Sequence, residues 1–362
     1  MKLIRFFLLL VIYIGANYYV FSHFYNLVPI RYSVIYILLV VLSIFISFSI
    51  LPVLIIPKKL TIKSITFLYT LGTSWIFILI YAILIFGILD LVIYYLYPIP
   101  LWMNVGLALI CLFSIFYCGN INYKKKKRVE LNIAINKPLK KNIKIVAISD
   151  LHLGYTINSK ELNEWIQLIN QEKADILLIP GDIIDNNVNP LYYYQLAPYF
   201  NKFHAPLGIY ACLGNHEYIS GIDSSIKFLE KTNVHLLRDS YVDIEGIFYL
   251  IGRDDKTNSH RKTLKEVIKN IDSSQPIILL DHQPYGLEES QKNGIDIQLS
   301  GHTHRGQVWP ISWITDKLYE VSHGYKKKGN TNIYVSSGIG IWGGKFRIGT
   351  QSEYVVINLS SI

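Results

Sequence analysis

Charged side chains are scarce in this chain. They make up 17% of its 362 residues, and the mean hydropathy is +0.30, which excludes an ordinary soluble enzyme. Cysteine is also rare: two of the three, Cys111 and Cys118, lie in an apolar segment, and Cys212 lies in a predicted strand. This pattern gives no argument for a disulfide framework. The apolar surplus falls in residues 1–120, and the rest has the mixed polarity of one globular domain.

The apolar part contains four runs long enough to cross a membrane, since a bilayer core needs about 20 apolar residues in a helix. The runs lie near residues 6–22, 33–56, 66–89 and 100–119. We interpret the first as a retained helix, because it lacks a small-residue cleavage site and three spans follow it. The third extends toward Pro98 and is too short for two spans and a turn, so it predicts one tilted helix. We therefore predict a four-helix transmembrane anchor over 1–120.

Lysine and arginine are unevenly divided between the two sides of these spans. Ten fall on one side, namely Lys2, Arg5, Lys58, Lys59, Lys63, Lys124, Lys125, Lys126, Lys127 and Arg128, whereas Arg31 alone falls on the other. The positive-inside rule predicts a multi-pass cell-membrane protein with a cytoplasmic C-terminal domain. The run at 124–128 lies in a predicted basic linker over 121–142. It is interpreted as a topology signal facing anionic headgroups, because it has no interleaved aromatics for nucleic-acid binding.

Asp90 is the one acidic residue near a predicted span. A carboxylate inside a membrane would suggest a function, but Asp90 lies at the end of its segment, where it can reach the interface. The spans carry no paired charges and no evident internal repeat that would indicate a transporter. We expect the helices to act as an anchor, with the lipid bilayer as their partner.

Five apolar runs of strand length lie in the second part, and each ends on a polar block. The runs are 143–148, 175–179, 207–213, 276–280 and 296–300. A helical pattern over 159–171, with Ser159 as its N-cap, lies between the first two. Side chains at the carboxyl ends of successive strands converge on one edge of a sheet. The sequence therefore predicts an α/β domain over 143–362 with a single site.

The polar blocks contain the ligand types of a two-metal site. They read Ser-Asp-Leu-His at 149–152, Gly-Asp-Ile-Ile-Asp at 181–185, Gly-Asn-His-Glu at 214–217, Asp-His at 281–282 and Gly-His-Thr-His at 301–304. Imidazole and carboxylate ligands without thiolates suit manganese, iron or zinc. Asp182 can bridge two ions because a carboxylate offers two oxygens. Two cations about 3.5 to 4 Å apart acidify a bridging water, whose hydroxide attacks a phosphoryl group held between them.

These blocks resemble the calcineurin-like metallophosphoesterase superfamily. The resemblance covers about residues 143–362 and implies a four-layer α/β/β/α sandwich with two divalent metal ions. It also extends to a tail that membrane-anchored bacterial-type members share, seen here as Val-Ser-Ser-Gly-Ile-Gly at 335–340, Arg-Ile-Gly at 347–349 and Glu353. Related enzymes cleave phospholipid-like or nucleotide-sugar lipid substrates. The family therefore implies a phosphorylated small molecule or lipid as substrate.

The resemblance also implies a role for each residue of the blocks. The first metal would be held by Asp150, His152 and His304, the second by Asn215, His282 and His302, and Asp182 would bridge them. His216 would be the acid that protonates the leaving group, oriented by Asp185. Asp281 is either a partner of His282 or a structural residue. The histidines outside the blocks, including His23 and His323, are expected to have surface or packing roles.

Two features beside the last block concern the substrate. Arg305 stands where the family commonly has glycine, and it is either a phosphate contact or a solvated loop residue. The segment 308–329 contains Trp309, Trp313 and a lysine cluster. It is either a membrane-interface element that opens the site toward a lipid substrate, or a packed loop with a solvated lysine turn.

Two classes of function fit the sequence. One is a membrane-anchored phosphoesterase acting on a phosphodiester, pyrophosphate or monoester, with a lipid-linked substrate favoured. The other is a non-catalytic scaffold or sensor that binds a phosphoryl ligand at the membrane. The presence of every expected metal ligand favours the enzyme.

Overall fold

The computed structural model describes residues 2–29 and 32–362. The chain divides into two compact units, and each is described by itself below. The first is Met1–Asn120 with Gly343–Lys345, and the second is Ile121–Trp342 with Phe346–Ile362.

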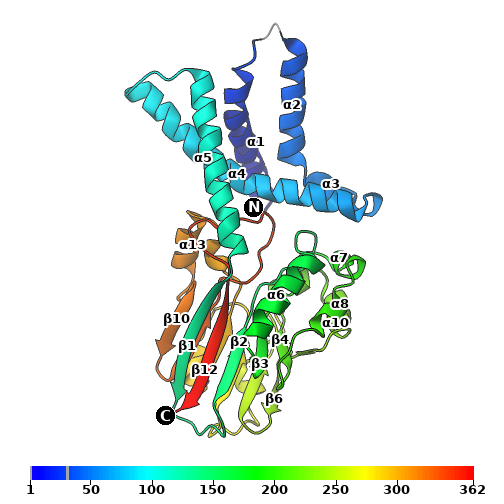
Figure 1. Cartoon of the computed structure of the whole chain (residues 1–362), viewed down its shortest axis with the longest axis vertical. Helices are drawn as coiled ribbons and strands as arrows, with labels where there is room; N and C mark the ends of the chain where they lie inside the picture. Colours follow the sequence, from blue (N-terminus) through cyan, green and yellow to red (C-terminus); the bar gives the residue numbers. More distant parts are fainter. Residues whose placement is uncertain (1, 30–31) are drawn as a thin grey trace. The chain divides into compact units, whose positions relative to one another are not determined.

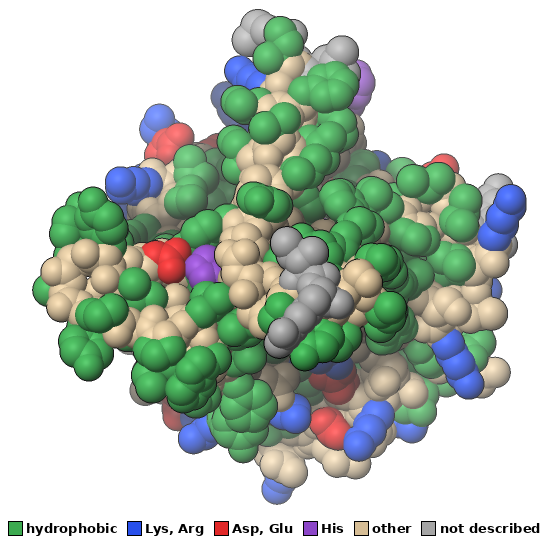
Figure 2. All heavy atoms as spheres, turned by 90° about the horizontal axis from the view of Figure 1, so that it is seen from above, with side chains coloured by type: hydrophobic (Ala, Val, Ile, Leu, Met, Phe, Trp, Pro, Cys, Tyr) green, Lys and Arg blue, Asp and Glu red, His purple; other side chains and the backbone are tan. Residues whose placement is uncertain are grey.

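The first unit is helical (Figure 1). It contains α1 (Lys2–Tyr25), α2 (Ser33–Phe48), α3 (Leu51–Ile55), a 3₁₀ turn (Pro57–Lys59), α4 (Ile62–Tyr95) and α5 (Leu101–Lys124), of which the last four residues belong to the second unit. Figure 2 shows hydrophobic side chains over much of the surface of these helices, and many large apolar residues of α1 and α2 are exposed. Such a surface is unfavourable in water and suits a lipid environment.

Three helices in the described residues, and not the predicted four, are long and apolar enough to cross a membrane: α1, α4 and α5. The predicted span over 33–56 was wrong as a single helix. It divides into α2 and α3, and Pro52, at the start of α3, cannot donate the backbone hydrogen bond that would continue α2. At 16 residues, α2 is about 24 Å long, shorter than the roughly 30 Å hydrocarbon core. The single long helix predicted for the third run is confirmed as α4, whereas Arg31 lies outside the described residues.

Asp90 anchors a polar network among α1, α4 and α5. Its carboxylate accepts hydrogen bonds from the Tyr19 hydroxyl at 2.6 Å and the Asn104 amide at 3.4 Å, and it lies 3.1 Å from Nε2 of His23. Because an unpaired polar group is costly among apolar helices, this network holds the three helices together. His23 is buried by that packing role.

The second unit is built on two six-stranded sheets. In the first sheet the order is β1 (Lys127–Ile135), β12 (Glu353–Ser361), β2 (Ile143–Ala147), β3 (Ile176–Pro180), β4 (Ile209–Cys212) and β5 (Val234–Leu236). The β12 and β2 strands are antiparallel, and the other neighbours are parallel. The predicted linker over 121–142 thus contains an edge strand, β1, whose nine residues all pair with β12.

The second sheet has antiparallel edges around a parallel centre. Its order is β10 (Gly324–Lys328), β11 (Thr331–Val335), β9 (Ile297–Ser300), β8 (Ile277–Leu280), β7 (Phe248–Gly252) and β6 (Ser240–Ile244). The antiparallel pairs are β10 with β11 and β6 with β7. All five apolar runs form strands, but β2, β3 and β4 lie in the first sheet and β8 and β9 in the second. The prediction that the ligands line one edge of one sheet was therefore wrong.

One hydrophobic cluster contains side chains from both sheets, including Ile145, Leu178, Leu250 and Leu280. The two sheets thus share one part of the hydrophobic core. As a result, the carboxyl ends of strands from both sheets supply the polar blocks described below.

Helices cover the outer side of the first sheet. The longest is α6 (Ser159–Gln171), whose buried side chains Leu162, Trp165 and Ile166 pack with Val146 of β2 (Figure 1). The predicted N-cap was one residue late: Asn158 accepts the backbone N–H groups of residues 160 and 161. The remaining helices are α7 (Asn189–Tyr193), α8 (Ala197–Phe200), α9 (Asn215–Ile219), α10 (Ile222–Leu229), α11 (Leu264–Val267), α12 (Leu287–Lys292), α13 (Ile311–Leu318) and the 3₁₀ turn η2 (His304–Gly306).

Candidate metal centre

The polar blocks form tight loops at the ends of their strands. Five predicted ligands adopt a left-handed backbone with φ between 47° and 73°: Asp150, His152, Asp182, His302 and His304. Each such non-glycine residue costs about 1 to 3 kcal/mol, and strain of this kind gathers at functional sites. The loops turn sharply enough to bring side chains of several strands to one place.

The first cluster consists of Asp150, His152 and His304, all of them buried. The Nε2 atoms of the two histidines are 2.9 Å apart, and Oδ1 of Asp150 lies 3.6 Å from Nε2 of His304. Among the described residues, Oδ2 of Asp150 has no hydrogen-bond partner. A buried carboxylate oxygen without a partner, beside two converging ring nitrogens, fits a bound cation.

The second cluster consists of Asp182, His282 and His302, with Asn215 beside them. Nε2 of His282 lies 3.0 Å from Oδ2 of Asp182, and Nδ1 of His302 lies 2.8 Å from Oδ1 of Asn215. Nδ1 of His282 lies 2.8 Å from the Pro180 carbonyl. That carbonyl can only accept a hydrogen bond, so Nδ1 carries a proton, and in the neutral ring the lone pair on Nε2 of His282 is left for a metal.

Asp182 lies between the two clusters. Its Oδ2 is 3.0 Å from Nε2 of His282 and 3.8 Å from Nε2 of His152. Its Oδ1 accepts the backbone N–H of His216 at 2.9 Å. The structure therefore turns one carboxylate oxygen toward both clusters and uses the other to hold α9, whereas the sequence argument had assigned one oxygen to each ion.

Glycine is required beside both carboxylates. A Cβ at Gly301 would lie 2.3 Å from Oδ2 of Asp150, and a Cβ at Gly214 would lie 2.2 Å from Oδ1 of Asp182. Any side chain at either position would displace the carboxylate. The Gly-His-x-His and Gly-Asn-His blocks thus supply space as well as ligands.

Burial keeps two of the histidines neutral. It lowers the pKa of His302 to about 4, with a further contribution from the charge of His282. Burial also lowers the pKa of His304 well below its ordinary value, and the nearby Arg347 acts in the same direction. At neutral pH both rings therefore keep a lone pair for a cation.

Asp182 and His282 stabilise each other's charged forms. Burial alone would raise the pKa of Asp182, but the charge of His282 and its hydrogen bond lower it well below the ordinary value. Burial alone would likewise lower the pKa of His282, and the Asp182 carboxylate raises it. A metal ligand must be the neutral imidazole, so a cation bound here would take the place of the His282 proton beside Asp182.

Asp185 supports two histidines at once. Its Oδ1 lies 3.4 Å from Nδ1 of His152 and 3.3 Å from Nδ1 of His216, and its backbone carbonyl lies 3.0 Å from the same His216 atom. Burial would lower the pKa of His216, but the hydrogen bond with Asp185 and the charge of Asp182 raise it to about 9. Asp185 thus orients a first-cluster histidine as well as His216.

Sequence reasoning quoted Glu217 in its block but gave it no role. The buried Glu217 carboxylate accepts backbone N–H groups of Asp182 at 3.2 Å, Ile184 at 2.9 Å and Gly214 at 2.7 Å. Burial, followed by the charge of Asp182, raises its pKa to about 7. Glu217 fastens the Asp182 loop to the loop of Asn215, and its place in the Gly-Asn-His-Glu block was the available signal.

Arg347 was also missed as a site residue. Its guanidinium is fully buried and donates to the His304 carbonyl at 2.8 Å and the Ser337 carbonyl at 2.5 Å, and it lies 3.1 Å from Nδ1 of His304. Burial lowers its pKa to about 10. Arg347 fixes the ring and backbone of His304, and the only signal was its place in the shared tail.

The residues assigned to substrate lie near the metal loop but outside the clusters. Arg305 follows His304 and is exposed, while Trp309 is 39% exposed and packs edge-to-face with Trp313 at 5.3 Å. Asp281 is not part of either cluster. It pairs with Arg253 at 3.2 Å and Arg261 at 3.1 Å, which makes it a structural residue.

The chain matches known proteins along this part. The profile of the family described as calcineurin-like phosphoesterase matches residues 143–306. An uncharacterized metallophosphoesterase of Helicobacter pylori is 35% identical over 67% of this chain and 66% of its own length. A Campylobacter jejuni metallophosphoesterase is 33% identical over 73% and 71%.

A "transmembrane protein with metallophosphoesterase domain" of Danio rerio is 29% identical, over 70% of this chain and 62% of its own length. The matches thus span about two thirds of these relatives. The ligand types of the two clusters, which are carboxylate, imidazole and amide, fit a pair of divalent metal ions. The chain belongs to the calcineurin-like metallophosphoesterases, a family of phosphoric ester hydrolases.

Proposed function

We propose that this chain is a membrane-anchored phosphoesterase with a dinuclear metal centre. The observation that carries the proposal is the position of Asp182, whose Oδ2 faces ring nitrogens of both clusters. Asp150, His152 and His304 would hold one divalent ion, and Asn215, His282 and His302 the other. When bound, two such ions acidify a water and withdraw charge from a phosphoryl group. Mn, Fe and Zn all suit these ligands.

His216 is the proposed acid for the leaving group. With its Nδ1 held by Asp185, its Nε2 is left to donate a proton to the departing oxygen as the P–O bond breaks. The side chain retains 15% exposure, so that a substrate can reach it. Water supplies the oxygen that ends on phosphorus, and His216 supplies the proton that ends on the alcohol.

We propose a lipid-linked phosphoester as the substrate, because of α13. Its residues Trp313, Ile314 and Leu318 are 61%, 58% and 66% exposed, and Trp309 precedes it. A Cβ at Gly306 would lie 2.5 Å from the backbone nitrogen of Ser312, so α13 packs directly on the loop that carries His304. An exposed apolar face next to a metal site suits an amphipathic substrate at a membrane interface.

The proposed anchor is the helical unit, inserted in the cell membrane with the α/β unit on the cytoplasmic side. With three long apolar helices as spans, Arg31, Lys58, Lys59, Lys63 and the basic run at 124–128 fall on the side of the α/β unit, against Lys2 and Arg5 on the other side, and this excess supports the placement. Labelling of a cysteine placed at the exposed Lys265, in a background with Cys111 and Cys118 replaced by serine, tests it. A membrane-impermeant reagent should react only after the cells are opened, and reaction with intact cells would contradict the orientation.

A hydrolase assay tests the activity itself. The full-length protein with Mn²⁺ should cleave a generic aryl phosphodiester, and Asp182→Ala and Asn215→Ala should each reduce the rate by about 1000-fold or more. Asp223→Ala, which removes an exposed carboxylate outside the site, should keep the parent rate. Absence of metal-dependent turnover in the parent would favour a phosphoryl-binding scaffold instead.

A further inference from the structure

A cavity of about 290 Å³ begins beside the metal loop and lies wholly within the second unit. Arg305, Lys127 and His323 contribute basic side chains to its lining, and Ser337, Gln351 and Glu353 contribute polar ones. Its volume is close to the lower limit of small-molecule sites. Neither the metal clusters nor the proposed acid His216 is part of its wall.

The cavity is joined to the first metal cluster through two residues. Arg305 directly follows His304, so their Cα atoms are about 3.8 Å apart. The guanidinium of Arg347 donates to the carbonyl of Ser337, which lines the cavity, and to the carbonyl of His304. A group bound in the cavity would therefore lie next to the loop that holds the first metal.

The one carboxylate in the lining is held by hydrogen bonds from its neighbours. Glu353 is buried, lies 3.1 Å from Nε2 of His323, and accepts the Tyr334 hydroxyl at 2.9 Å and the backbone N–H of Ser337 at 3.0 Å. Both oxygens of the Glu353 carboxylate therefore have hydrogen-bond partners within the protein, and His323 is one of these partners.

The other polar groups of the wall are also committed. The Ser337 hydroxyl donates to the Gln351 carbonyl at 2.7 Å, and the Thr350 hydroxyl donates to the Gln307 carbonyl at 3.1 Å. The Asn122 amide donates to the Arg347 carbonyl at 3.2 Å. These bonds hold the wall in place, and the two long basic side chains of the lining take no part in them.

Lys127 and Arg305 are those two side chains. Both are exposed, and among the side chains that the structure describes, neither the ammonium nor the guanidinium has a hydrogen-bond or ion-pair partner. Their backbones are fixed, because the Lys127 N–H donates to the Ser352 carbonyl and the Arg305 N–H to the Thr303 hydroxyl. Two unpaired cations thus face one cavity whose carboxylate is satisfied.

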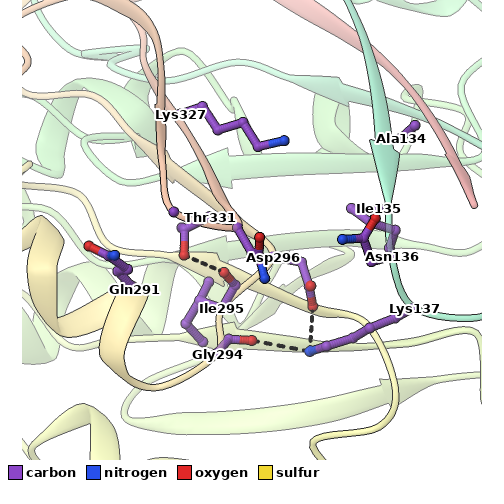
Figure 3. A pocket seen from close by; sticks show the side chains of 12 residues that line it. Ala134, Ile135, Asn136, Lys137, Gln291, Gly294, Ile295, Asp296, Lys327 and Thr331 are labelled. Atoms are coloured by element: carbon purple, nitrogen blue, oxygen red, sulfur yellow. Dashed lines mark hydrogen bonds and ion pairs between the residues drawn. The ribbon is translucent and has the colours of Figure 1, made fainter. Parts of the chain in front are cut away.

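A larger cavity of about 370 Å³ gives the contrast (Figure 3). There Lys137 donates to Asp296 at 2.7 Å and to the Gly294 carbonyl at 3.1 Å, so its charge is neutralised within the wall. Lys327 is the remaining cation of that lining. A single solvated lysine does not make an anion site, whereas a lysine and an arginine across one cavity can bind two oxygens of the same group.

We propose that the cavity of Lys127 and Arg305 binds a phosphate group, and that this group belongs to the substrate beside the ester that is cleaved. The second half of this statement rests on the proposed function, and the first does not. The group could be carried by a lipid headgroup or by a free small molecule. One residue of the lining, Asn122, lies near the end of α5, a helix long and apolar enough to cross a membrane.

Calorimetric titration of the full-length protein in detergent tests the binding without any need for turnover. The probe is sn-glycerol 3-phosphate, added to metal-loaded protein and to protein treated with a chelator. We expect one molecule per chain to bind after chelation. Lys127→Gln and Arg305→Gln should each weaken that binding about tenfold. Lys327→Gln, which removes an exposed lysine from the other cavity, should leave it unchanged.

Vesicles distinguish the two sources of the phosphate. If the group comes from a lipid, phosphatidylcholine vesicles containing phosphatidic acid should compete with the probe, and the same two substitutions should remove that competition. If the group comes from a soluble molecule, the vesicles should not compete with the probe, and the two substitutions should weaken only the binding of the probe. Absence of binding after chelation, equal affinity in the Lys127 and Arg305 variants, or an equal loss in Lys327→Gln would overturn the proposal. Absence of hydrolysis alongside intact binding would instead overturn the proposed activity.

Discussion

Histidine and aspartate meet in both units of this protein, with opposite outcomes. In the helical unit, Asp90 has Tyr19, His23 and Asn104 as partners, and the group is closed on itself. In the α/β unit, the ring nitrogens of His152 and His304 converge at 2.9 Å, and Oδ2 of Asp150 has no hydrogen-bond partner among the described residues. A closed cluster stabilises packing, whereas a buried carboxylate oxygen without a partner beside two ring nitrogens can hold a cation.

The two units also differ in backbone strain. The left-handed non-glycine residues in the described part of the chain all fall in the second unit, and five of them are predicted metal ligands. The helical unit reaches its polar contacts from regular helices, so its network costs no unusual backbone geometry. Strain combined with unfulfilled donors and acceptors separates a site from a packing contact.

Replacing His216 should produce the largest change after loss of a metal ligand. His216→Gln should lower kcat by about 100-fold to 10,000-fold, because the leaving group then departs without an acid, and metal content should be retained. The rate should recover on substrates with a good leaving group such as 4-nitrophenol, which needs no proton. An equal loss on good and poor leaving groups would contradict the role of His216.

Replacing Arg347 should loosen the first cluster without removing a ligand. Arg347→Lys loses the fork that holds the His304 carbonyl and ring, and partners of this kind commonly affect metal affinity by about 10-fold to 100-fold. Competition with a fluorescent chelator measures this affinity for the first ion. An unchanged affinity would show that His304 is held by the rest of its loop.

Replacing Trp309 and Trp313 tests whether the exposed face of α13 has a function. The double alanine variant should lose several-fold activity on lipid phosphodiesters in vesicles, because an indole placed at an apolar interface adds buried apolar area to binding. Activity on a small soluble ester is the internal reference. Equal losses on both substrates would remove the argument for a lipid.

Replacing His23 should have the smallest effect and complete the comparison. His23→Gln should lower the stability of the helical unit by about 1 kcal/mol through weakened hydrogen bonding to Asp90, seen as a lower melting temperature in detergent. Bound metal should stay at the parent level. A loss of metal from this variant would mean that the two polar clusters are not independent.

Local patterns account for what could be predicted. The five apolar runs each form a strand, because strand propensity and turn residues act over a few positions; the runs are 143–148, 175–179, 207–213, 276–280 and 296–300. The polar blocks that follow these strands lie together, as the sequence predicted. The pairing of β1 with β12 joins residues more than 200 positions apart, and no periodicity within 121–142 signals it.

Long-range contacts account for the rest. His23 and Asp90 are 67 residues apart, and His304 and Arg347 are 43 apart, so their pairing depends on packing that the sequence does not display. The division of the ligands between two sheets also depends on long-range packing, because the sequence of an apolar run does not show which sheet the strand joins. The wrong prediction of one span over 33–56 has a local cause. The prediction followed the apolar length of the segment and gave too little weight to Pro52, which interrupts the helix.

Metal content per chain tests the central claim most directly. Full-length protein purified in detergent should contain two divalent ions per chain by inductively coupled plasma mass spectrometry. Asp182→Asn, which weakens the carboxylate between the clusters, should retain one or fewer, and His23→Gln should retain two. One ion or none in the parent, or two in Asp182→Asn, would contradict a dinuclear centre joined by Asp182.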